Sequence, residues 1–254
     1  MHIHLADFTG TLFVYFLVFA RTGSMIMLLP AIGEAGVPPR VRLALALAIS
    51  LAFAPTVAHD YPAKAPTSDL ALGLLIFQEI TAGILVGAIA RIIMSALSIA
   101  GNLIATQTGL SYAQQVDPTS DQQSVVIGNF FSLLGVVLIF ATNLHHLAIG
   151  AVAGSYSMIP PGAALPTGDM AELTVRLVSG SFALGLQLAA PFLVFGFAVN
   201  AAMGLLARLM PQLQVFFIAM PINILAGFLL MLLLMGSMMT LFLSYFTQQM
   251  GSFG

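Results

Sequence analysis

The chain has 254 residues, of which 59% are apolar and only 6% are charged, and its net charge at pH 7 is −2. A water-soluble domain carries about 25% charged residues, so most of this surface must face lipid or other protein, and the chain is predicted to be an integral membrane protein. The charge balance excludes a basic nucleic-acid footprint, and the absence of cysteine excludes disulfides, thiolate zinc sites and cysteine nucleophiles.

The N-terminal sequence MHIHLADF lacks both a basic region and a small-residue cleavage site before the first apolar run. We therefore expect that no signal peptide is removed and that the first apolar segment stays in the mature protein. Its two histidines alternate at a chain end, a pattern too weak to predict a metal site.

Six apolar stretches follow one another along the chain and are predicted to be helices. Crossing the hydrocarbon core takes about 20 helical residues. The second stretch is short for this, and the third, fifth and sixth are too long for one straight span, so six spans are only the simplest arrangement. The predicted fold class is an all-α membrane protein. The approximate bounds are Phe8–Pro30, Val41–Val57, Leu70–Thr108, Val125–Ala153, Leu173–Ala207 and Val215–Phe246.

Three prolines, Pro191, Pro211 and Pro221, interrupt the last two stretches. Proline removes a helical hydrogen bond and clashes with the preceding turn, so these stretches are predicted to be kinked or broken helices. Lipid cannot pair with the backbone groups that a break frees. We therefore expect any break to lie where protein or a water-filled cavity surrounds it.

A few polar side chains lie within or at the end of the apolar runs. A charge at the centre of a membrane helix costs about 2.5–3.5 kcal/mol on insertion scales, so it normally finds a partner or an aqueous cavity. Glu79 and Arg91 stand about 120° apart around a helix and roughly 18 Å apart along it, so each needs a partner from another helix or another subunit. The predicted subunit-packing polar residues are Arg21, Glu79, Arg91, Asn200 and Arg208.

Small residues recur at helical spacing beside these polar groups. Gly83 and Gly87 share a face with Glu79, while Gly196 and Gly204 alternate with Asn200 and Arg208 along the fifth stretch. Small residues let membrane helices approach closely, and polar side chains hydrogen-bond across the contact. The two stripes are predicted to pack helices, either within this chain or between subunits.

The sequence shows no enzyme active site. His145 and His146 are adjacent, so on a helix they point about 100° apart and are poorly placed to ligate one metal. A Walker loop, a GxSxG motif and an HExxH motif are all absent. We therefore expect a non-enzymatic protein without a cofactor.

Four blocks of sequence resemble the FliR/SctT family of type III secretion export-gate subunits. The first is FARTGSMIMLLPAIGEAGVPPRVRLALALAISLAFAP (Phe19–Pro55), and the second is GNLIATQTGLSYAQQVDP (Gly101–Pro118). TNLHHLAI (Thr142–Ile149) and the long block Ala190–Gly227 follow. Their order and spacing match the family over most of the chain, so the chain is identified as a member.

The resemblance implies a subunit of the flagellar export gate in the bacterial inner membrane, at the flagellar basal body. It implies long, kinked helical hairpins packed with FliP-like and FliQ-like subunits in a helical pore assembly through which unfolded protein substrates pass. FlhB-like and FlhA-like export components are further expected partners. It also implies a FliP-like portion at 1–170, and a FliQ-like helical hairpin at 171–254 that folds back near Arg208–Gln212.

The polar segment between the third and fourth stretches resembles the family's plug, a loop that closes the pore at rest. Neutral polar side chains cost less to desolvate than charges, and the apolar side chains of Leu110 and Tyr112 can seal against apolar walls. Without the resemblance, a solvated connector is the simpler interpretation. The predicted plug residues are Gly109, Leu110, Ser111, Tyr112, Ala113, Gln114, Gln115, Val116, Asp117 and Pro118.

Two other functions remain open from the sequence. The same family also serves the injectisome, the virulence form of the machine, and the sequence separates the two forms poorly. A secondary transporter would likewise have broken helices and charges near the membrane midplane. A transporter should also show inverted repeats with matching interrupted segments, and the two halves of this chain show no such correspondence.

Overall fold

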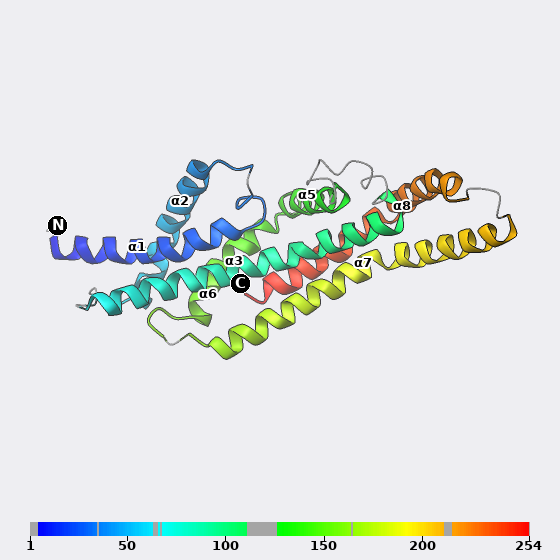
Figure 1. Ribbon diagram of the computed structural model, residues 1–254. Helices are drawn as coiled ribbons and strands as arrows, with labels where there is room; N and C mark the ends of the chain where they lie inside the picture. Colours follow the sequence, from blue (N-terminus) through cyan, green and yellow to red (C-terminus); the bar gives the residue numbers. More distant parts are fainter. Residues whose placement is uncertain are drawn as a thin grey trace. The chain divides into compact units, whose positions relative to one another are not determined.

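The computed structural model describes residues 5–34, 36–62, 66, 68–110, 126–163, 165–210 and 215–253, with side chains described from residue 10 and, in the last range, from residue 219. Within these ranges the chain is α-helical apart from short turns, and no strand occurs there, which confirms the predicted all-α class (Figure 1). The helices are α1 (Leu5–Leu28), α2 (Pro39–Val57), the short 3-10 helix η1 (Ala58–Asp60), α3 (Asp69–Gln107), α5 (Val126–Ala141), α6 (His145–Met158), α7 (Thr167–Leu209) and α8 (Val215–Gly251).

Five of the described helices are long and apolar enough to cross a membrane, and the number rises to six if α5 and α6 together form one span. Both α3 and α7 exceed what a single upright span needs, with 39 and 43 residues. The apolar helices make this a membrane protein, as its composition predicts. Its packing into a multi-subunit assembly stays a prediction.

The fourth predicted stretch is wrong as a single helix, because α5 and α6 meet at an angle of 79°. The break centres on Asn143, whose φ of 59° lies in the left-handed region. Asparagine enters this region more readily than most residues, and its N–H donates to the Phe140 carbonyl at 3.1 Å to close α5. The helix therefore ends just before Thr142 and Asn143, inside the predicted stretch Val125–Ala153.

The two prolines inside the last helices do not break them. Pro191 lies within α7 and Pro221 within α8, and each helix continues on both sides. Each proline removes one helical hydrogen bond, but ending a helix in lipid would leave several backbone groups without partners. Pro211 lies outside the described residues, between the end of α7 and the start of α8.

The chain forms two compact units, each assembled from separate stretches of sequence. One unit comprises Met1–Ile93, Phe140–Leu177 and Phe246–Gly254, and the other comprises Met94–Ile139 and Val178–Tyr245. The helices α3, α7 and α8 contribute to both. The predicted division into 1–170 and 171–254 rests on resemblance and not on packing, so it stays a prediction.

In the first unit, α3 packs closely against α1 through the predicted stripe of small residues. A Cβ on Gly83 would collide with the carbonyl oxygen of Arg21 and with the Ser24 hydroxyl. A Cβ on Gly87 would lie 2.7 Å from the Met25 carbonyl oxygen. This stripe therefore packs helices of the same chain, which is one of the two roles predicted for it.

In the second unit, the later half of α3 contacts α5, α7 and α8. The Ser98 and Ser132 hydroxyls lie 3.0 Å apart between α3 and α5. A Cβ on Gly185 of α7 would lie 2.8 Å from a methyl group of Ile99 on α3. The helices α7 and α8 also meet, because Gly180 faces the hydroxyl of Tyr245.

Candidate functional site

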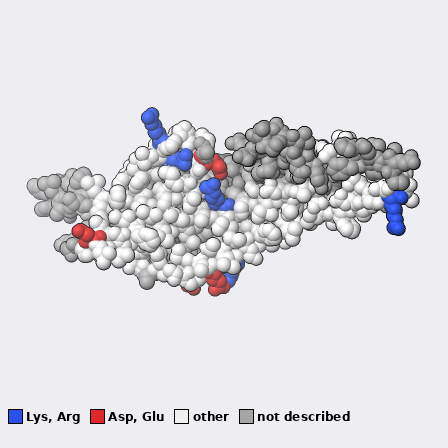
Figure 2. Space-filling model, viewed as in Figure 1, with Lys and Arg blue, Asp and Glu red and all other residues white. Residues whose placement is uncertain are grey.

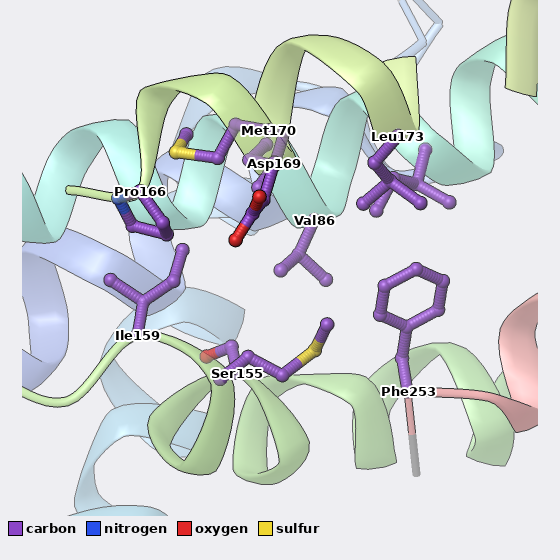
Figure 3. Close-up of a pocket in the computed structure, with 11 residues that line it drawn as sticks. Val86, Ser155, Ile159, Pro166, Asp169, Met170, Leu173 and Phe253 are labelled. Carbon is purple, nitrogen blue, oxygen red and sulfur yellow. The ribbon is translucent and has the colours of Figure 1, made fainter. Parts of the chain in front are cut away.

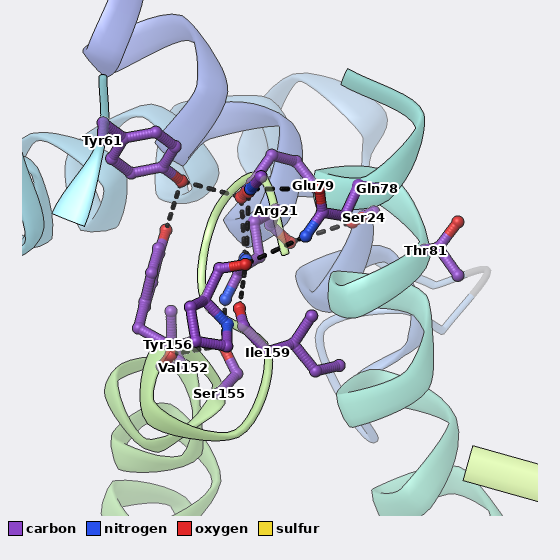
Figure 4. Close-up of polar contacts among 12 residues, drawn as sticks. Arg21, Ser24, Tyr61, Gln78, Glu79, Thr81, Val152, Ser155, Tyr156 and Ile159 are labelled. Atoms are coloured by element: carbon purple, nitrogen blue, oxygen red, sulfur yellow. Dashed lines mark hydrogen bonds and ion pairs between the residues drawn. The ribbon is translucent and has the colours of Figure 1, made fainter. Parts of the chain in front are cut away.

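The first unit contains a buried ion pair between helices α1 and α3 (Figure 4). Arg21 Nε lies 2.7 Å from Glu79 Oε2, and Arg21 Nη2 lies 3.0 Å from Glu79 Oε1. The two side chains are only 1% and 0% exposed. The guanidinium therefore meets the carboxylate at two points, the geometry in which arginine binds a carboxylate best.

The remaining donors of Arg21 reach α6 and the residue that follows it. Arg21 Nη1 donates to Ser155 Oγ at 3.2 Å, and Nη2 donates to the Ile159 carbonyl at 2.9 Å. The Arg21 Cζ also lies 4.0 Å from the centre of the Tyr156 ring, a cation–π arrangement. One side chain thus links α1, α3 and α6.

Tyr61 supplies a further hydrogen bond to the Glu79 carboxylate. Its hydroxyl donates to Glu79 Oε2 at 2.7 Å and lies 3.3 Å from the Tyr156 hydroxyl. Burial, and then the neighbouring Tyr156 and Glu79, raise the pKa of Tyr61. The hydroxyl therefore stays protonated at neutral pH and can act as the donor that the carboxylate needs.

A second polar tie stands next to the ion pair on α3. Gln78 Nε2 donates to the Pro160 carbonyl at 3.0 Å, and the Gly162 N–H donates to Gln78 Oε1 at 3.1 Å. Two consecutive residues of α3 therefore hold the segment that follows α6. These bonds join α1, α3 and α6 with the residues that follow η1 and α6, so the cluster holds these elements together. We call it the clamp, and its residues are Arg21, Tyr61, Gln78, Glu79, Ser155 and Tyr156.

A cavity of about 240 Å³ lies beside the clamp (Figure 3). Its walls are mostly apolar, and the Asp169 carboxylate is among the side chains around it. Among the described residues, no group of three His, Cys, Asp or Glu side chains could hold a metal ion. The lining residues are Leu85, Val86, Ile89, Ser155, Met158, Ile159, Pro166, Asp169, Met170, Leu173 and Phe253.

In the second unit, the C-terminal end of α3 is held by α7 and α8. The Gln107 side chain lies against Gly196 of α7, and the Thr108 side chain lies against Gly227 of α8. Asn223 Nδ2 donates to the Gln107 carbonyl at 3.4 Å. A cavity of about 220 Å³ adjoins this end and is lined by Thr106, Gln107, Gly109, Asn200, Met203, Met220 and Asn223.

The predicted plug begins at this end of α3. Gly109 has a φ of 80°, which places it in the left-handed region where glycine is preferred, and its N–H donates to the Thr106 carbonyl at 3.4 Å. Leu110 is half-buried. The rest of the predicted plug, residues 111–118, lies outside the described residues.

The structure places the five predicted polar residues in two different environments. Arg21 and Glu79 are buried partners within the chain, so Glu79 finds its partner on another helix. Arg91, Asn200 and Arg208 are exposed. The subunit-packing role of the five residues stays a prediction.

The second small-residue stripe is divided between contact and open surface. Gly196 contacts Gln107, whereas a Cβ on Gly204 would meet no described atom within 4 Å.

The ring centres of His145 and His146 lie 4.3 Å apart, and His145 stacks on Phe140. Ring packing is therefore the visible role of this histidine pair.

Sequence reasoning missed most of the clamp. Gln78 stands beside Glu79 in an apolar run, and this adjacent polar pair was a usable signal. Tyr61, Ser155 and Tyr156 carry no such signal, because a tyrosine or serine near a helix end is common. Only the fold brings them to the ion pair.

Most of this chain is similar in sequence to known proteins. The profile of bacterial export proteins, family 1, matches residues 12–249. Flagellar biosynthetic protein FliR of Caulobacter vibrioides is 41% identical over 87% of this chain and 88% of its own length. FliR of Bacillus subtilis is 30% identical over 87% and 85% of the two chains. Yop proteins translocation protein T of Yersinia pestis is 27% identical over 90% and 88%. These matches confirm the resemblance seen in the sequence, and the chain belongs to the bacterial export proteins, family 1.

Proposed function

We propose that this protein is a non-enzymatic subunit of the flagellar type III export gate. With FliP-like and FliQ-like subunits it forms the pore in the bacterial inner membrane through which unfolded flagellar proteins leave the cell. The similarity to FliR proteins along nearly the whole chain carries this proposal. The higher identity to these relatives than to the Yersinia translocation protein favours the flagellar form over the injectisome form.

The exposed surface of the second unit supports a partner-dependent role. The end of α7 is exposed on nearly all sides between Phe197 and Met210, and Phe197, Leu205 and Leu209 are 77%, 61% and 70% exposed. Charged side chains are few and scattered on the face shown in Figure 2. A helix whose exposed surface is mostly apolar is normally surrounded by lipid or protein. Neighbouring subunits would supply that cover.

The same proposal gives the segment 109–118 the role of plug. Its neutral glutamines and serine can leave and re-enter water at a lower cost than charged groups, and Leu110 and Tyr112 supply the apolar seal. A solvated connector would need neither apolar group. Gly109 and Leu110, the two residues of the segment that the structure describes, leave α3 where α7 and α8 meet it.

The test is secretion by a flagellated bacterium whose own gene for this subunit has been removed. Expression of this chain should restore the export of hook and filament proteins into the medium. Removal of the FliP-like partner should abolish the recovery. Normal secretion without this chain, or recovery that needs no FliP-like or FliQ-like partner, would contradict the proposal.

A further inference from the structure

The end of α3 is attached to α7 and α8 by side chains that fit against glycines. The ideal Cβ position of Gly196 lies 3.0 Å from Gln107 Cβ, and that of Gly227 lies 2.7 Å from Thr108 Cβ. Real Cβ atoms essentially never approach another atom more closely than 3.0 Å. Gly227 therefore has no room for a Cβ while α8 lies this close to Thr108. At Gly196 the closest atom is the far end of the flexible Gln107 side chain, so a Cβ would fit there only tightly.

Asn223 adds a polar tie at the same place. The last carbonyl groups of a helix have no partner inside the helix, and a carbonyl left unpaired in an apolar environment is costly. Asn223 of α8 donates to the Gln107 carbonyl at 3.4 Å. Its Nδ2 also lies 3.3 Å from the position that a Cβ on Gly109 would take. The amide therefore contacts both the last residue of α3 and the residue where the chain turns.

From these contacts we infer that Gln107, Thr108 and Asn223 form a clasp that sets the direction in which the chain leaves α3. Gly109 turns the chain in the left-handed conformation directly after the clasp. The helices α7 and α8 thus position the first residues of the segment assigned as plug. The clasp itself is a set of contacts within the second unit and stands without the proposed function. Only its effect on the plug segment rests on the proposed function.

The clasp makes the end of α3 move together with α7 and α8. A displacement of α7 or α8 moves Gln107 and Thr108, since neither can pass the glycine backbone that it touches. The departure point at Gly109 moves with them. A cavity of about 220 Å³ adjoins Gln107 and Gly109 on the side of Asn200 and Met203. The direction in which the chain leaves α3 thereby follows the position of α7 and α8.

Cysteine cross-linking in the full complex tests the contact itself, because the natural chain has no cysteine. Disulfides need Cβ atoms about 3.5–4.5 Å apart, so Gln107→Cys with Gly196→Cys requires only a small outward shift. Oxidation should link this pair in most molecules, as measured by mass spectrometry of the joined peptides. Gln107→Cys with Gly204→Cys is the matched control, because Gly204 lies two turns further along α7. Equal linking of both pairs, or no linking of the first, would overturn the clasp.

Membrane leak tests the positioning role. Asn223→Leu removes the donor at similar size, and it should raise ion leak several-fold at normal complex levels. Met220→Leu changes a side chain that lines the same cavity without holding Gln107, and it should leave the leak unchanged. Asn223→Gln should restore part of the seal. Asn223→Asp, which lacks the donor but keeps the shape, replaces the leucine variant if that variant fails to assemble, and it should leak as well.

The outcomes separate the clasp from the plug. A complex that leaks after deletion of Leu110–Gln115 but not after loss of the Asn223 donor has a plug that the clasp does not position, and the inference is then wrong. A complex that leaks in neither case contradicts the plug. The cross-linking result then decides alone whether α7 holds the end of α3.

Discussion

Arg21 and Glu79 stand 58 positions apart in the sequence and form a buried two-point ion pair between α1 and α3. The remaining donors of Arg21 bind Ser155 and the Ile159 carbonyl, and Glu79 accepts a further bond from Tyr61. A buried pair of this kind adds little net stability compared with apolar residues, but loss of one partner leaves an uncompensated buried charge. We therefore expect the pair to fix the register of the helices more than it strengthens them.

Removal of one partner should destabilise the first unit. Glu79→Ala leaves the Arg21 guanidinium buried without its carboxylate, and we expect a loss of about 3–5 kcal/mol, measured as a lower thermal midpoint and lower yield in mild detergent. Combining Arg21→Met with Glu79→Leu should recover much of this loss, because no buried charge is left. Glu172→Gln breaks the exposed pair with Arg176 and is the control, with little expected change. Equal stability of Glu79→Ala and this control would contradict the clamp.

Gly83→Ala should disrupt the contact between α3 and α1. The new methyl group would collide with the Arg21 carbonyl oxygen, which belongs to the backbone and cannot rotate away. Gly73→Ala, on the same helix but with no described atom near its Cβ, should leave stability unchanged or raise it by up to about 1 kcal/mol. The check is the thermal midpoint of both variants. A tolerated alanine at Gly83 would show that the two helices can separate freely.

The isolated chain should be poorly stable, because the exposed apolar end of α7 needs a cover. Coexpression with FliP-like and FliQ-like subunits should raise its yield and monodispersity. Arg208→Ala and Gly204→Leu change exposed positions on α7, so each should lower assembly into the complex and leave the first unit intact. A well-behaved monomer with unchanged thermal stability would contradict this dependence. Secretion lost in a fully assembled Arg208→Ala complex would assign that residue to conduction.

Shortening the proposed plug should open the gate without destroying the assembly. Deletion of Leu110–Gln115 removes the apolar sealing groups, so the passive leak of ions should rise while complex levels stay normal. Tyr112→Ala should leak less, because one lost side chain leaves most of the obstruction in place. Membrane conductance of cells with idle secretion measures both. A connector would respond with strained flanking helices and reduced complex yield, without a leak.

The sequence predicts the helix bounds well where an apolar run ends at a polar residue or proline. The predicted stretch Leu70–Thr108 and the helix α3 (Asp69–Gln107) differ by one residue at each end. The break at Asn143 could not be predicted in the same way. Thr142, Asn143 and the two histidines lower the hydropathy there, but polar residues also occur inside membrane helices, and the break comes from one left-handed residue. Hydropathy reports burial in lipid and carries no information about one backbone angle.

The candidate site could be predicted only in part. Periodicity placed Glu79, Gly83 and Gly87 on one face of α3, and that face does pack against a helix. Periodicity cannot name the partner on a different helix, so the pairing of Glu79 with Arg21 needed the fold. The clasp at Gln107 was not predicted for a similar reason, since its contacts come from glycines more than 80 positions away.

Imaging of the purified complex is the most direct test of whether this chain is a subunit of an export gate. The chain should be coexpressed with its FliP-like and FliQ-like partners, purified in mild detergent and viewed by electron microscopy at low resolution. We expect a closed multi-subunit cone that contains this chain. A lone helical bundle, with the partners purifying separately, would contradict the assignment of this protein to an export gate.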